Sequence, residues 1–66
     1  MAIETAAQKY ATRAANIQRL LAELAADLKA HQEVAELEPR NWGLVGDLAN
    51  VEELLQRATD FMNGRD

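Results

Sequence analysis

The sequence contains no cysteine, no serine and only one histidine among its 66 residues. Without cysteine the chain forms no disulfide and no thiolate zinc site. A single histidine leaves a self-contained structural zinc site short of ligands. The threonines Thr5, Thr12 and Thr59 have no histidine near them in sequence, so no activated nucleophile is indicated. The sequence therefore predicts neither an enzyme nor a bound cofactor.

Basic residues and long apolar runs are also scarce. Lys and Arg number 7 against 11 Asp and Glu, which gives a net charge of −4. This acidic balance disfavours broad contact with phosphate backbones or anionic lipid. No apolar run approaches the length of a membrane span, and no basic segment followed by a hydrophobic one indicates a signal peptide. We therefore expect a small acidic cytoplasmic protein with no membrane contact.

Proline occurs only at residue 39, and the segment before it, about residues 3–37, has no glycine. This segment is rich in Ala, Leu, Gln, Glu, Lys and Arg, which are strong helix formers. Thr5 and Gln8 fit a capping box, which would place the first helical turn at Ala6. Pro39 disfavours helical geometry at the residue before it. The sequence therefore predicts one long helix over about residues 3–37.

A shorter helix is predicted over about residues 41–63. Pro39 could be its first residue, and Asn41 and Asp47 are alternative caps, so the start lies between residues 39 and 47. We favour a start between Pro39 and Trp42, because an apolar stripe with alternating steps of four and three residues already begins there. That stripe comprises Leu44, Leu48, Val51, Leu55, Ala58 and Met62, widened by Leu54 and Phe61.

All three glycines follow Pro39 in the sequence. Gly43 and Gly46 oppose an early start, since each costs about 1 kcal/mol in a helix interior. A frayed first turn would reconcile them with the stripe. Gly64 predicts the C-terminal stop, in the left-handed conformation. Glu53 and Arg57 are spaced for a favourable ion pair on the exposed side.

The first helix carries a longer apolar stripe with the same alternating spacing, which is typical of a helix buried along one side. Its two rows are Ile3, Tyr10, Ile17, Leu24 and His31, and Ala7, Ala14, Leu21, Leu28 and Ala35. Leu20, Val34 and further alanines lie beside these rows and widen the apolar face. A face this wide suits a helix with two neighbours, as in a four-helix bundle.

These patterns predict an all-α fold, an antiparallel two-helix hairpin, as a single domain over residues 1–66 with no linker. The first helix would be about 50 Å long and the second about 33 Å, so residues 3–15 would extend beyond the second helix. A chain this short buries only about 60% of its unfolded surface, so a second chain is expected to support it. We expect a homodimer forming a four-helix bundle, paired in parallel or antiparallel. The expected interface comprises Ile3, Ala7, Tyr10, Ala14, Ile17, Leu21, Leu24 and Leu28.

Asp27 and His31 are one helical turn apart and could hold a metal ion on one helix face. The alternative interpretation, which we favour, is a histidine near the end of the bundle that Asp27 orients. The Glu-x-x-His motif of di-iron bundles is absent, because Leu28 stands three residues before His31.

Arg40 and Trp42 lie beside the proline turn, where a cation and a planar ring could grip a ligand or a protein partner. The alternative interpretation is that Trp42 covers the end of the hairpin core and Arg40 is solvated.

Lys9, Arg13 and Arg19 lie on the flank of the first helix and could contact nucleic acid. In size and helical layout the chain resembles the small plasmid copy-control hairpin dimers, although no motif aligns. The acidic surroundings and the lack of interleaved aromatic residues argue against this contact.

The favoured hypothesis is a non-enzymatic interaction or regulatory protein that acts through helical self-association and a contact with a protein partner. One alternative is a small-ligand or metal binder that uses Asp27 and His31 or the Trp42 turn. A second alternative is a weak RNA- or DNA-binding hairpin dimer of the copy-control type.

Overall fold

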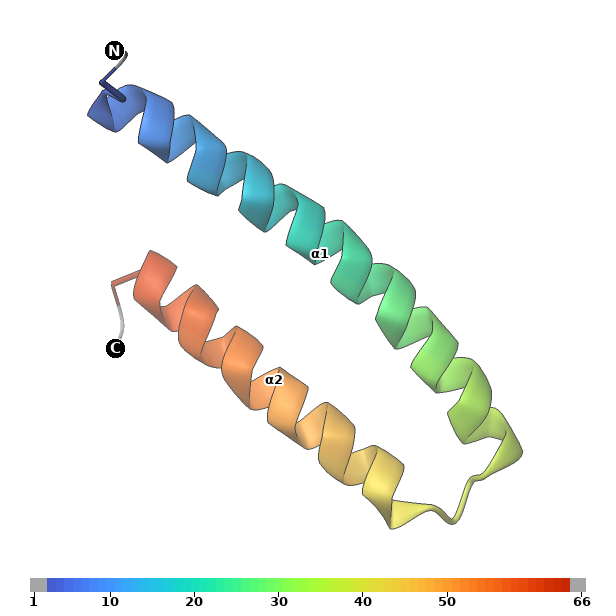
Figure 1. Cartoon of the computed structure of the whole chain (residues 1–66). Helices are drawn as coiled ribbons and strands as arrows, with labels where there is room; N and C mark the ends of the chain where they lie inside the picture. Colours follow the sequence, from blue (N-terminus) through green and yellow to red (C-terminus); the bar gives the residue numbers. More distant parts are fainter. Residues whose placement is uncertain (1–2, 65–66) are drawn as a thin grey trace. The chain divides into compact units, whose positions relative to one another are not determined.

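A computed structural model describes residues 3–64 of the chain (Figure 1). This range contains two α-helices and no strand: α1, Ala6–Leu37, has 32 residues, and α2, Trp42–Met62, has 21. At about 1.5 Å per residue they are about 48 and 32 Å long. The chain divides into two compact units between Glu33 and Val34, a point inside α1. The all-helical prediction is confirmed for the described residues.

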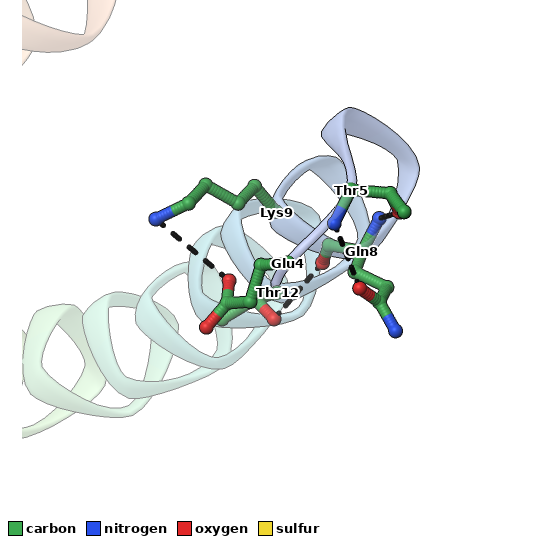
Figure 2. Close-up of polar contacts among 5 residues, drawn as sticks. All are labelled: Glu4, Thr5, Gln8, Lys9 and Thr12. Atoms are coloured by element: carbon green, nitrogen blue, oxygen red, sulfur yellow. Dashed lines mark hydrogen bonds and ion pairs between the residues drawn. The ribbon is translucent and has the colours of Figure 1, made fainter. Parts of the chain in front are cut away.

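The capping box predicted from Thr5 and Gln8 defines the start of α1. The backbone N–H of Thr5 donates to Oε1 of Gln8 at 2.8 Å, and the N–H of Gln8 donates to Oγ1 of Thr5 at 3.1 Å (Figure 2). Each residue thus satisfies a backbone donor that a helix start would otherwise leave unpaired. The helix begins at Ala6 rather than at residue 3, so Ile3 lies outside it, as the cap predicted.

The connection between the helices contains the proline turn. The N–H of Glu38 donates to the carbonyl of Ala35 at 3.1 Å, and the N–H of Asn41 donates to the carbonyl of Glu38 at 3.0 Å. Pro39 and Arg40 lie within this turn. The proposal that Pro39 is the first residue of the second helix is therefore wrong.

Asn41 caps α2. It has an extended backbone, with φ −83° and ψ 96°, and its Oδ1 accepts the N–H of Gly43 at 3.0 Å. Helix α2 then begins at Trp42, within the start range that we favoured. Asp47, the other proposed cap, lies in the interior of α2, so that alternative is wrong.

Gly43 and Gly46 both lie inside α2. Helix α2 therefore starts before both glycines, despite their low helix propensity. At the other end, Gly64 has a φ of 70°, the left-handed conformation that glycine adopts without steric cost. Its N–H donates to the carbonyl of Phe61 at 3.1 Å, which confirms the predicted stop. The predicted pair between Glu53 and Arg57 also forms, with Nη2 of Arg57 2.9 Å from Oε1 of Glu53.

None of the residues from 3 to 64 is buried. The eight least exposed residues are only half-buried, and seven of them belong to the apolar stripes of the two helices. They are Ala14, Leu24, His31, Ala35, Leu44, Leu48, Val51 and Asp60. Each helix therefore has well-defined ends, and neither unit by itself buries a hydrophobic residue.

Candidate interaction surface

The interface predicted on α1 lies almost entirely within that helix. Seven of its eight residues fall between Ala7 and Leu28, inside Ala6–Leu37. Residues spaced three and four apart lie on one side of a helix, so these seven form a continuous stripe, which we name the α1 stripe. Ile3 precedes Thr5 by two residues, and helical periodicity does not place it on the stripe.

Most of the large side chains of the α1 stripe are exposed to solvent. Tyr10 is 77% exposed, Leu21 54% and Leu28 41%. Ala14 and Leu24 are half-buried. Contiguous apolar side chains left in water are typical of a surface that associates with another molecule.

Helix α2 carries the second apolar stripe that the spacing predicted. Leu44, Leu48 and Val51, in its first half, are half-buried. Leu55 is exposed, and so is Met62 at the end of the helix. Both helices therefore present one apolar side, as expected for elements of a bundle.

Arg40 and Trp42 lie on either side of the cap residue Asn41, with Arg40 in the turn and Trp42 at the first position of α2. The Trp42 side chain is 80% exposed. Val45, three residues later, is also exposed and lies on the same side of α2. Sequence reasoning missed Val45, although its spacing of three residues from Trp42 was the available signal.

Asp27 and His31 both lie in α1, four residues apart on one side of the helix. His31 is half-buried and Asp27 is exposed. Residues 3–64 contain no group of three or more His, Cys, Asp and Glu side chains that could hold a metal ion. Two ligands are fewer than a tetrahedral zinc site requires, so Asp27 and His31 do not form a metal centre by themselves.

Two of the three basic residues considered for a nucleic-acid contact are paired with carboxylates. Nζ of Lys9 lies 3.7 Å from Oε2 of Glu4, beside the capping box in Figure 2. Nη1 of Arg19 lies 2.9 Å from Oε1 of Glu23. These pairs offset the positive charge that a phosphate backbone would need.

Arg13 is the third of these basic residues. It helps to line a shallow open depression of about 200 Å³, together with Glu4, Lys9 and Thr12. Thr12 donates its hydroxyl hydrogen to the carbonyl of Gln8 at 3.1 Å, within the same helix. Such a depression encloses much less of a ligand than a small-molecule site does.

Comparison with known proteins assigns no family to the chain. It matches no protein-family model, no curated protein and no solved structure. Neither α1 nor α2 is both long and apolar enough to cross a membrane. The functional argument therefore depends on the two apolar stripes, the Trp42 turn and the charges of α1.

Proposed function

We propose that the protein is a non-enzymatic interaction or regulatory module that acts through helical self-association. In this proposal α1 and α2 fold back as an antiparallel hairpin, and two hairpins form a four-helix bundle. The observation that carries the proposal is the exposure of Tyr10, Leu21 and Leu28 on the α1 stripe, in a described chain without a buried residue. Burying large apolar side chains stabilises a complex by about 1.5–3 kcal/mol each, so covering this stripe gives a strong driving force.

A second contact lies outside the stripe. Trp42 and Val45 form an exposed apolar pair on α2, and Arg40 stands beside them in the turn. Tryptophan and arginine are the residues that most often dominate binding at protein interfaces. We therefore assign Arg40 and Trp42 to the contact with a different protein partner, separate from self-association.

Sedimentation equilibrium over a range of concentrations tests the self-association. The wild-type chain should have the mass of a dimer, and Leu21→Asp should weaken the dimer by about 100-fold, because it places a charge in the apolar stripe. Ala26→Asp is the matched control, since it adds the same charge on the opposite side of α1. It should leave the dimer within about threefold of wild type, as surface substitutions usually do.

A wild-type chain that stays monomeric up to millimolar concentration would contradict the proposal. So would an equal effect of Leu21→Asp and Ala26→Asp on the dissociation constant. Far-UV circular dichroism of both variants separates a loss of dimer from a loss of helix.

A further inference from the structure

A row of residues beside the α1 stripe has a charge pattern that is complementary to itself. Arg13, Leu20 and Asp27 are spaced by seven residues, so all three lie on one side of α1. Arg13 and Asp27 stand at equal distances on either side of Leu20. When two copies of this row lie antiparallel, the basic end of one copy meets the acidic end of the other. The two apolar centres, at Leu20, then meet each other.

We propose that α1 pairs antiparallel with α1 of a second copy of this chain, with the two-fold axis beside Leu20. Arg13 then faces Asp27 of the partner subunit, and Asp27 faces the partner's Arg13. This arrangement rests on the proposed self-association and gives it an orientation. Two-fold symmetry makes both ion pairs identical, so one row of residues supplies two pairs.

The charges on this row are available for such pairing. Neither the Arg13 guanidinium nor the Asp27 carboxylate has a hydrogen-bond or ion-pair partner within residues 3–64, whereas Lys9 is paired with Glu4 and Arg19 with Glu23. In a parallel pair of helices, a residue that flanks the stripe, such as Arg13, meets the residue five positions later on the other chain. Arg13 would then meet an uncharged glutamine, Gln18, and no ion pair would form.

The sizes of the stripe residues favour the same orientation. With Leu20 at the centre, Leu21 packs against Ile17 of the partner subunit, Ala14 against the partner's Leu24, and Ala7 against the partner's His31. A small residue therefore opposes a large one toward each end of the pair. A parallel arrangement would place Ala14 opposite Ala14 and Tyr10 opposite Tyr10, which leaves cavities at some levels and crowds others.

Charge reversal tests the proposed contact directly. Arg13→Asp alone and Asp27→Arg alone each replace two attractive contacts with two repulsive ones, so each homodimer should weaken by about tenfold. The double variant, Arg13→Asp with Asp27→Arg, regenerates both pairs with reversed signs and should return to within about twofold of wild type. An equal mixture of the two single variants should form mainly heterodimers, because that combination restores both pairs.

Arg19→Asp and Glu33→Arg are the matched controls, since they make the same charge changes on the side of α1 opposite the stripe. Each should leave the dimer within about threefold of wild type, and their mixture should show little preference for heterodimers. Recovery in the double variant at 13 and 27, without a comparable effect at 19 and 33, supports the pairing. Equal effects at the two pairs of sites would overturn it.

Spin-label distances measure the orientation independently of charge. The chain has no cysteine, so Arg19→Cys and Glu33→Cys each introduce one labelling site. Antiparallel pairing places the labels at 19 nearly level and separates those at 33 by about 40 Å along the axis. Parallel pairing gives the same distance at both sites and would overturn the orientation. A dimer with equal distances contradicts only this inference, whereas a monomer contradicts the proposed function as well.

Discussion

The two helices differ in how much of their structure is specified locally. Helix α1 has 32 residues without glycine or proline, and it begins at a reciprocal cap in which Thr5 and Gln8 each accept a backbone N–H. Helix α2 has 21 residues, contains two glycines in its first turns, and begins at a single amide cap from Asn41. The comparison teaches that α1 is a helix by composition, whereas α2 depends more on being packed against something else.

Separate peptides give the largest expected difference. A peptide of residues 3–38 should be mostly helical in water, and one of residues 39–64 should have less than about half that helicity per residue. The shorter length of α2 and its glycines, each unfavourable by about 1 kcal/mol, are the reason. Far-UV circular dichroism of both peptides at low concentration makes the comparison. Equal helicity per residue would show that local composition does not distinguish the two helices.

The caps give the next largest effect. Asn41→Ala removes the acceptor of the Gly43 N–H and should destabilise α2 by about 1 kcal/mol, as loss of an amide cap usually does. Thr5→Ala should cost less in the whole protein, because the backbone N–H of residue 5 still donates to Oε1 of Gln8. Urea unfolding gives both free energies, and amide hydrogen exchange at Gly43 locates the loss. A larger effect from Thr5→Ala would reverse the proposed order of the two ends.

Gly46→Ala measures the weakness within α2 itself. A methyl group built on Gly46 meets nothing within 4 Å, so alanine fits and should stabilise the helix by about 0.8 kcal/mol. The same change at Gly43 should gain less, because its new methyl would lie 3.0 Å from Oδ1 of the cap residue Asn41. Thermal and urea unfolding of the two variants provide the comparison. If Gly46→Ala destabilises the protein, another helix must approach this side of α2 closely.

The ends of both helices could be predicted from sequence because they depend on a few adjacent residues. Thr5 with Gln8 and the left-handed Gly64 each act within one helical turn, and both predictions are confirmed. The start of α2 is harder to predict, since Pro39 is a good first residue and Asn41 and Asp47 are both good caps. The carbonyl of Glu38 decides it by accepting the Asn41 N–H, which leaves Pro39 inside the turn.

The candidate interface shows where such prediction stops. Spacing identifies the side of α1 that is apolar, and the structure places Tyr10 and Leu21 on that side, exposed. Spacing does not identify the neighbour. The apolar residues of a stripe have the same spacing whether another helix of this chain or a second copy covers them. The charges at Arg13 and Asp27 carry the additional information, since their effect depends on the direction of the partner helix.

The smallest predicted effect compares one ion pair from each helix. Arg57 pairs with Glu53, four residues before it, whereas Arg19 pairs with Glu23, four residues after it, and both N–O distances are 2.9 Å. An acidic residue on the N-terminal side of its basic partner agrees better with the helix dipole and is the more stabilising order. Glu53→Gln should therefore cost about 0.4 kcal/mol at low salt, and Glu23→Gln less than half as much.

Double-mutant cycles with Arg57→Gln and Arg19→Gln isolate the two pair energies. Both energies should fall toward zero in 1 M salt, where charges are screened within about 3 Å. Equal pair energies would mean that distance, rather than the direction of each pair along its helix, sets the contribution of these exposed charges.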